Sequence, residues 1–253
     1  MRPNPLLLGL ALAPLAASGP LAPGPLLAEP IRSIQYEFPA DTARALRWKT
    51  GSGAFTFGAW DEPSVLAEVR IHCAGTDEEA CRREAETIQL EWLQKGDRIE
   101  LGVGAPPAAS GDGKGGDGKG VEAGPPPAPS ALTIEGRLRV PAGLPLEVNL
   151  ESGSVDVSGL WGDVAVELGS GDASLLLSRR RAGAVDLTSD TGTVELTVNG
   201  RRVPGDLEPR DGPRALHWKG EGRSAIKVKV GTGNARVRLE DGGKLEPGGG
   251  GKP

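Results

Sequence analysis

The stretch Ser152-Gly153-Ser154-Val155-Asp156-Val157 decides the fold, because versions of it return along the chain. Each version has a small or hydroxylated residue, a glycine, and two apolar residues separated by one position. The other copies are Ser170-Gly171-Asp172-Ala173-Ser174-Leu175, Thr191-Gly192-Thr193-Val194-Glu195-Leu196 and Thr232-Gly233-Asn234-Ala235-Arg236-Val237. Successive glycines lie 18, 21 and 41 positions apart, so the last gap is close to two periods. A period of about 20 residues, with a turn glycine opening each alternating strand, predicts stacked β-strands of the solenoid type.

Around each glycine, apolar and polar residues alternate with the period of two that is typical of a strand with one buried face. The positions expected to face the core are Leu146, Val148, Leu150, Val155, Val157, Val164, Val166, Leu168, Ala173, Leu175, Leu177, Val185, Leu187, Val194, Leu196, Val198, Ile226, Val228, Val230, Ala235, Val237 and Leu239. One repeat buries about five such side chains, which is worth about 10 kcal/mol. Ordering its backbone costs about 20 to 40 kcal/mol. We therefore expect the repeats to be stable only when stacked.

The chain divides into two β segments around a low-complexity stretch. The first segment, 33–104, contains Gly53-Ala54-Phe55-Thr56-Phe57, another copy of the repeated phrase, and a short helix expected over about 77–87. Its N-cap is predicted at Thr76, with Glu79 completing a capping box. The second segment, 131–239, holds the repeats, and 105–130 and 240–253 are rich in Gly, Pro and Lys and are predicted to be disordered. The predicted fold class is all-β, a single stack with one short helix.

The N-terminus predicts export. In residues 1–28, Arg2 precedes the apolar run Leu6-Leu7-Leu8-Gly9-Leu10-Ala11-Leu12-Ala13, which is too short to cross a bilayer as a helix. We interpret 1–28 as a signal peptide, cleaved after Ser18 or Ala28, with a disordered leader or a retained anchor as the alternatives. No later stretch is apolar enough to span a membrane, so the mature chain is expected in the periplasm or at the cell surface.

Cys73 and Cys81 are the only cysteines, and an exported protein is expected to pair them as a disulfide. A metal site would need two further ligands, and only His72 is near. The stretch Gly113-Lys114-Gly115-Gly116-Asp117-Gly118-Lys119-Gly120 has glycine where a phosphate loop needs Ser or Thr. We therefore predict no metal and no cofactor. The net charge of −5 gives no general attraction to nucleic acid.

Several longer motifs follow one another along the chain: Gly53-Ala54-Phe55-Thr56-Phe57-Gly58-Ala59-Trp60-Asp61, Gly96-Asp97-Arg98-Ile99-Glu100-Leu101, Leu138-Arg139-Val140-Pro141-Ala142-Gly143-Leu144-Pro145-Leu146-Glu147-Val148, Ser158-Gly159-Leu160-Trp161-Gly162-Asp163-Val164 and Gly231-Thr232-Gly233-Asn234-Ala235-Arg236-Val237. In the order and spacing of these motifs, the chain resembles the bacterial DUF4097 family of adhesin-like β-repeat proteins. It implies a β-solenoid-like envelope protein and no set of catalytic residues.

Two sets of outward residues are the candidate sites. Asp156, Glu167, Asp186 and Glu195 are acidic, and stacking would have to bring two of them together to form a glycosidase-like pair. Solvated strand faces are the simpler interpretation. Lys227, Lys229, Arg236 and Arg238 are basic and close the repeat region, so they form a candidate surface for an anionic envelope polymer or an envelope protein. Protection of a terminal strand against edge-to-edge aggregation is the simpler interpretation, and the two roles are compatible.

The sequence contains no recognisable catalytic constellation, since neither His72 nor His217 lies in a nucleophile motif. We therefore predict an exported, non-catalytic envelope scaffold or adhesin-like binding module. The alternatives are an enzyme acting on envelope polysaccharide and an accessory protein in envelope-stress signalling.

Overall fold

The computed structural model describes residues 29–74, 77–104, 132–204 and 213–241. The predicted signal peptide, the 105–130 linker and the tail from residue 242 lie outside this range. The described residues form one open sheet with a single helix, α1 (Glu78–Thr87). Its strands are β1 (Arg32–Pro39), β2 (Ala45–Trp60), β3 (Ser64–Cys73), β4 (Gln89–Lys95), β5 (Arg98–Gly104), β6 (Leu132–Pro141), β7 (Leu146–Ser158), β8 (Val164–Ser178), β9 (Ala182–Val198), β10 (Arg201–Arg202), β11 (Arg214–Lys219) and β12 (Ser224–Glu240).

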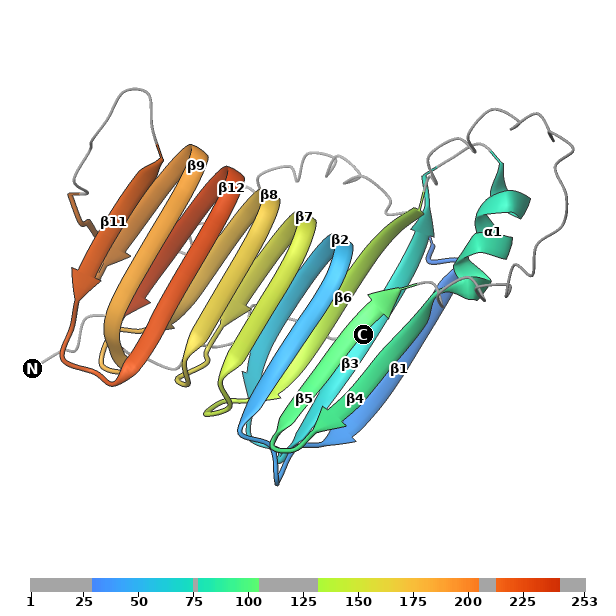
Figure 1. Ribbon diagram of the computed structural model, residues 1–253, viewed down its shortest axis with the longest axis horizontal. Coiled ribbons are helices and arrows are strands. Elements are labelled where there is room, and N and C mark those ends of the chain that lie inside the picture. Colours follow the sequence, from blue (N-terminus) through green and yellow to red (C-terminus); the bar gives the residue numbers. More distant parts are fainter. Residues whose placement is uncertain (1–28, 75–76, 105–131, 205–212, 242–253) are drawn as a thin grey trace, which may run out of the picture.

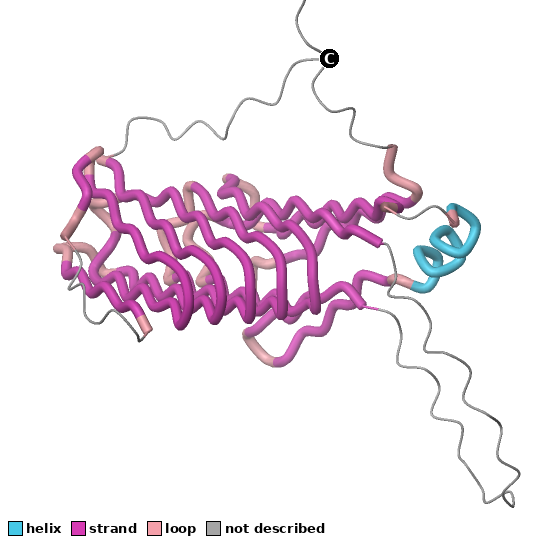
Figure 2. The backbone as a smooth tube through the Cα atoms, turned by 90° about the horizontal axis from the view of Figure 1, so that it is seen from above, coloured by secondary structure: helices cyan, strands magenta, loops and turns pink. Residues whose placement is uncertain are grey.

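The long strands β2, β7, β8, β12 and β9 lie side by side in that order, and every neighbouring pair is parallel (Figure 1). Each of these strands folds over on itself, so the stack has two layers joined along one side (Figure 2). We call the part of each strand before its bend the first arm and the part after it the second arm. The repeated phrase of the sequence lies at the bend.

The bend is made by one glycine from each strand, stacked in register from Gly53 through Gly153, Gly171 and Gly233 to Gly192. All five have a positive φ, between 120° and 146°, which L side chains rarely adopt. A side chain would also have no room, because a Cβ on Gly171 would overlap the carbonyl oxygen of Gly153 and one on Gly233 would overlap that of Gly171. Glycine is therefore required at the bend both by its backbone conformation and by the approach of the neighbouring strand.

The core lies between the two layers and contains the predicted alternating residues. Val155, Ala173 and Ala235, which follow the bend in successive strands, are each at most 1% exposed. Val194 and Val198 in β9 are only partly buried, because β9 is the last long strand of the stack. From the first segment, Trp48 and Phe55 contribute large aromatic side chains to the same core, with ring centroids 5.0 Å apart.

Shorter strands extend the two layers at both ends. On the β2 side, the layer of first arms is extended by β5 and then β4. The layer of second arms is extended by β6, then β3 and then β1. Beyond β9, β11 extends the first arms and the two-residue strand β10 the second. β2 belongs to the first sequence segment and pairs with strands of the second. The two segments therefore share one sheet and one core.

The all-β class with one short helix is confirmed, but the strands do not stack in chain order. A regular solenoid adds each repeat to the end of the previous one, whereas here β12 lies between β8 and β9. The long interval between Gly192 and Gly233 is therefore not a double period. It contains β10 and β11, after which the chain returns to insert its last strand into the stack.

The helix begins at Glu78, one residue later than predicted, and Thr76, the predicted N-cap of the capping box, lies outside the described residues. Its N-cap is Asp77, whose carboxylate accepts a hydrogen bond from the backbone N–H of Ala80 at 2.9 Å. Asp is as good an N-cap as Thr, and the acidic Glu78 and Glu79 in the first turn also suit the positive end of the helix dipole.

Candidate functional site

The two layers present two polar outer surfaces. We call the outer surface of the first arms the first face and that of the second arms the second face. On the first face, in-register neighbours form a row that crosses the sheet from β5 to β11: Glu100, Arg47, Glu147, Ala165, Lys227, Asp186 and His217. Charges of opposite sign therefore alternate along much of this row.

The predicted basic surface is not a single patch. Lys227 and Lys229 precede the bend at Gly233 and lie on the first face, whereas Arg236 and Arg238 follow it and lie on the second face. Nor are they at the end of the sheet, because β12 is paired on both sides. The expectation of a basic terminal strand is therefore wrong, and these residues have no edge to protect. This prediction failed because β12 is inserted between two other strands, and no local sequence pattern indicates that insertion.

The basic residues instead lie among the acidic set. Lys229 donates a hydrogen bond to Glu167 at 3.0 Å, and this bond together with the nearby negative charge raises the pKa of Lys229. Lys227 is in register with Asp186, and Arg236 is in register with Glu195. The charges compensate one another from strand to strand, which disfavours a surface for anionic polymer.

The four acidic candidates are also separated. Glu167 and Asp186 lie on the first face with β12 between their strands, and Asp156 and Glu195 lie on the second face with β8 and β12 between theirs. One intervening strand places two side chains about 10 Å apart. Asp186 is hydrogen-bonded to His217 at 2.6 Å instead. The structure therefore brings no two of these four carboxylates together on neighbouring strands.

The described residues form an open groove of about 960 Å³ on the first face, near the bend. It lies between the β4–β5 hairpin and the first arms of β2, β7 and β8. Its lining includes Lys49, Gly51, Leu90, Glu91, Trp92, Leu93, Glu100, Gly102, Asn149, Glu151, Glu167 and Gly169. Its volume is at the upper end of the range of small-ligand sites, about 300 to 1,000 Å³.

The groove combines apolar surface with carboxylates. Leu93 is 52% exposed and is among the few large apolar side chains that the described chain leaves open to solvent, whereas the ring of Trp92 lies on the inner side of β4 and packs against Phe38. Four glutamates and a single lysine line it. Lys95, just outside, donates a hydrogen bond to Glu100 at 2.8 Å, and this bond is the main reason why the pKa of Glu100 is lowered. The lining is therefore acidic overall, with two of its glutamates held by neighbouring lysines.

Sequence reasoning missed this groove because its walls come from both segments of the chain. Glu91 belongs to β4 and Glu151 to β7, and the 105–130 linker separates them in sequence. The only local signal is the presence of glycine at the outward positions 51, 102 and 169, where a surface strand would ordinarily carry a side chain.

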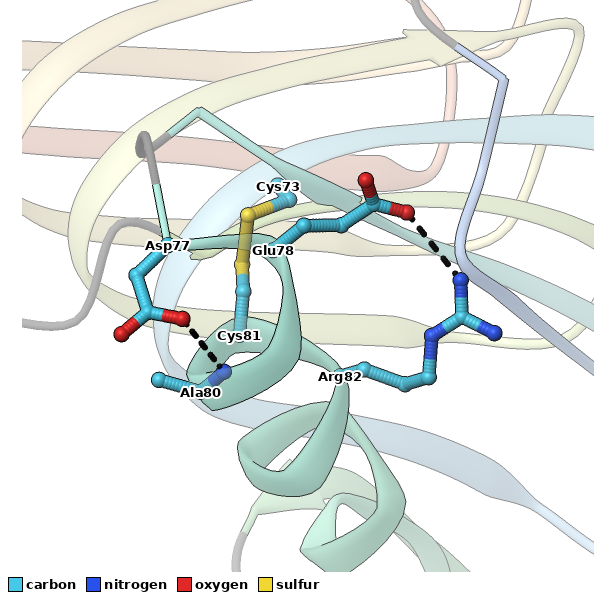
Figure 3. Close-up of a disulfide and its surroundings, with 6 residues drawn as sticks. All are labelled: Cys73, Asp77, Glu78, Ala80, Cys81 and Arg82. Atoms are coloured by element: carbon cyan, nitrogen blue, oxygen red, sulfur yellow. Dashed lines mark hydrogen bonds and ion pairs between the residues drawn. A yellow bond between two sulfur atoms is a disulfide. The ribbon is translucent and has the colours of Figure 1, made fainter.

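The predicted disulfide is confirmed. Cys73 at the end of β3 and Cys81 in the first turn of α1 are bonded, with their Cα atoms 6.0 Å apart (Figure 3). The guanidinium of Arg32 donates hydrogen bonds to the carbonyl oxygens of Ala85 and Glu86, so the other end of the helix is also tied to the sheet. This arrangement positions α1, and both cysteines are bonded to each other rather than present as reactive thiols.

Within the residues described, no cluster of three or more potential ligands could hold a metal ion. No helix in the same residues is long and apolar enough to cross a membrane.

In sequence, the chain matches no known family and no curated protein. Among solved structures it is similar to a candidate cell adhesion protein from Clostridium sporogenes, with 12% identity and a TM-score of 0.45 over 82% of this chain and 99% of the other. It is also similar to a candidate lipid binding protein from Parabacteroides distasonis, with 10% identity and a TM-score of 0.27 over 83% and 95% of the two chains. Likenesses this distant assign no function, and the resemblance to DUF4097 stays a prediction.

Proposed function

We propose that this protein is an exported, non-catalytic binding module of the cell envelope, and that its ligand lies in the first-face groove. The observation that carries the proposal is the groove itself, an open site in which the exposed side chain of Leu93 lies beside several carboxylates. Binding sites typically combine apolar contact surface with a few polar groups that set orientation. The signal-peptide pattern and the Cys73–Cys81 disulfide support export.

A binding role fits the groove better than catalysis does. Two of its glutamates, Glu100 and Glu167, are engaged by Lys95 and Lys229. The candidate carboxylates of the enzyme hypothesis lie on different faces or on strands that are not neighbours. The acidic lining favours a neutral or partly cationic ligand over the anionic polymer that the basic residues suggested.

The proposal is tested by sedimentation of the purified protein with insoluble cell-wall polysaccharide. Leu93→Ala and Glu151→Lys change the groove without touching the core, and we expect each to weaken binding at least tenfold, that is by about 1.4 kcal/mol. Asp156→Asn is the matched control, because Asp156 is exposed on the second face. Equal binding by the control and the groove variants would contradict the assignment of the site. A reporter fused after residue 40 that stayed in the cytoplasm would contradict export.

A further inference from the structure

Three turns meet on the edge of the stack opposite the bend. They are 159–163 between β7 and β8, 179–181 between β8 and β9, and 220–223 between β11 and β12. Each leads into the start of a first arm, and they lie side by side because β12 lies between β8 and β9. The backbone N–H groups of Arg223 and Ser224 donate hydrogen bonds to the carbonyl oxygen of Arg181 at 3.0 and 2.9 Å, and the hydroxyl of Ser224 donates one to the carbonyl oxygen of Trp161.

Cationic side chains outnumber acidic ones at these turns. The cationic residues are Arg179, Arg180, Arg181, Lys219 and Arg223, and the acidic residues are Asp163, Glu221 and Asp241. We call this group of residues, together with Trp161, the basic corner. Asp241 is already engaged, since Arg179 donates a hydrogen bond to it at 2.8 Å and Arg180 lies close to it. Asp163 accepts a hydrogen bond from the backbone N–H of Ala225 at 2.8 Å. In a chain with a net charge of −5, this corner is locally basic.

An exposed tryptophan holds one of these arginines in place. The guanidinium of Arg181 lies over the indole of Trp161, 5.3 Å from the ring centroid, and Trp161 is 49% exposed. The indole in turn lies against Gly143, where a Cβ would be 2.6 Å from its Nε1 atom. Neither Arg181 nor Arg223 has a side-chain hydrogen bond or ion pair within the residues that the structure describes. A guanidinium stacked on a ring keeps its N–H donors available for oxyanions such as phosphate.

The arrangement of the cations favours an anionic surface over a small anion or a single polymer chain. They lie on turns at the rim of the stack, outside the first-face groove. The 179–181 turn crosses from the second arm of β8 to the first arm of β9, so the charges extend over two layers that are about 10 Å apart. An anionic membrane presents phosphate groups in two dimensions and attracts each nearby Lys or Arg. Tryptophan is enriched at the membrane–water interface, which suits the exposed Trp161.

We propose that the basic corner docks the protein on an anionic membrane surface, with Arg181 and Arg223 at the lipid phosphates and Trp161 at the interface. The contact is peripheral, because it uses only side chains on turns. The first-face groove lies near the bend, at the opposite edge, so docking leaves it open to its ligand. The membrane contact does not depend on what the groove binds.

The test measures binding of the full chain, with its disulfide intact, to vesicles of phosphatidylcholine alone and to vesicles of phosphatidylcholine and phosphatidylglycerol in equal parts. The ratio of the two affinities isolates the effect of charge, because any apolar contribution from residues 1–28 is common to both. We expect the native chain to prefer the anionic vesicles by at least about thirtyfold, and added salt to reduce this preference. Arg181→Gln/Arg223→Gln should lower the ratio by about thirtyfold, since each arginine near the surface contributes about five- to sixfold.

Arg137→Gln/Arg236→Gln is the matched control. Both residues are exposed on the second face, at the third position after the bend, so this variant loses the same charge away from the basic corner. It should keep the native ratio. Leu93→Ala in the groove should keep it too, so a failure of the groove proposal would leave this one standing. A native ratio in Arg181→Gln/Arg223→Gln, or an equal loss in the control, would overturn the proposal. Circular dichroism verifies that each variant keeps its fold.

Fluorescence distinguishes a membrane from a soluble polyanion. Nitroxide-labelled phosphatidylcholine in the anionic vesicles should quench the tryptophan emission of the native chain. Trp161→Phe should lose most of that quenching, because Trp161 is the indole placed at the contact. Polyphosphate that binds the basic corner as tightly as the vesicles do, with no quenching by the labelled lipid, would assign the corner to a soluble polyanion and overturn the membrane proposal.

Discussion

At the scale of single residues, five stacked glycines make the bend on which the whole fold depends. Each combines a positive φ with a contact to the backbone of the next strand, so the requirement has two independent physical causes. The sequence predicts these positions correctly, because the small residue before each glycine and the alternation after it are local patterns.

Gly171→Ala tests this explanation. The substitution forces an L residue into φ 120° and places a methyl group against the carbonyl of Gly153. We expect a loss of about 3 kcal/mol or more in the free energy of unfolding, from backbone strain and overpacking of about 1 to 3 kcal/mol each. Gly58→Ala is the control, because a Cβ there meets no atom within 4 Å, and urea unfolding should show a change of about 0.5 kcal/mol at most. Equal losses at the two positions would contradict the role of the bend.

Three shifted groups predict how stability depends on pH. The pKa values of Glu100 and Asp241 are lowered, by hydrogen bonds from Lys95 and Asn199 in the first place, and the pKa of Lys229 is raised by its bond to Glu167. The carboxylates therefore stabilise the fold above their unfolded pKa of about 4, and this contribution is lost as the pH falls through their lowered values. The lysine contributes below about pH 10.4, and its contribution is lost as the pH rises through its raised pKa.

The measurement is the urea midpoint as a function of pH. We expect a plateau between these limits, and a smaller decline on the acid side in Glu100→Gln, because the variant has no carboxylate to protonate. Lys95→Gln removes the partner and should reduce the acid decline in the same way. An acid decline that is unchanged in both variants would show that this pair contributes nothing to stability.

At the scale of elements, sequence patterns predict the faces of the strands but not their neighbours. The alternation in Ile226, Val228 and Val230 identifies the buried side of β12, and all three are at most 2% exposed. The same alternation occurs in every long strand, so it cannot distinguish a partner in β8 from one in β7. Neighbours are selected by tertiary packing, and the alternating charges of the first face, such as Lys229 beside Glu167, are consistent with the observed order.

The helix α1 is the element whose attachment is simplest to remove. The disulfide joins residues eight apart, and closing so small a loop is worth about 2.6 kcal/mol in the chain-entropy model. We expect Cys73→Ser/Cys81→Ser to increase hydrogen exchange in α1, while the long strands keep their protection because they do not contact the bond. Loss of protection in β7 or β8 would instead mean that the disulfide stabilises the whole sheet. Substituting Arg32 by Met removes the other attachment and should add to the effect.

At the scale of the whole molecule, the order of the strands determines which residues meet. The insertion of β12 between β8 and β9 divides the predicted basic surface, separates the predicted acidic pair and leaves β9 as an end of the stack. The groove likewise exists only because β2 joins the two segments, with β5 and β7 both paired to its first arm. The predicted basic and acidic residue sets therefore do not predict the function of this chain. Long-range strand pairing places their members on different faces or on strands that are not neighbours.

Cross-linking tests this order most directly. On the second face, Arg236 is in register with both Ser174 of β8 and Glu195 of β9. The two cysteines of Arg236→Cys/Glu195→Cys therefore lie on adjacent strands, within the Cα separation of about 4.4 to 6.8 Å that a disulfide needs, and should oxidise to a disulfide readily while the native disulfide stays intact. In Ser174→Cys/Glu195→Cys the two thiols have β12 between them, about 10 Å across the sheet, and should react poorly. We expect fast intramolecular cross-linking in the first variant and little in the second. The reverse result would mean that β8 and β9 are neighbours, as in a stack that follows the order of the chain, and would contradict the structure described above.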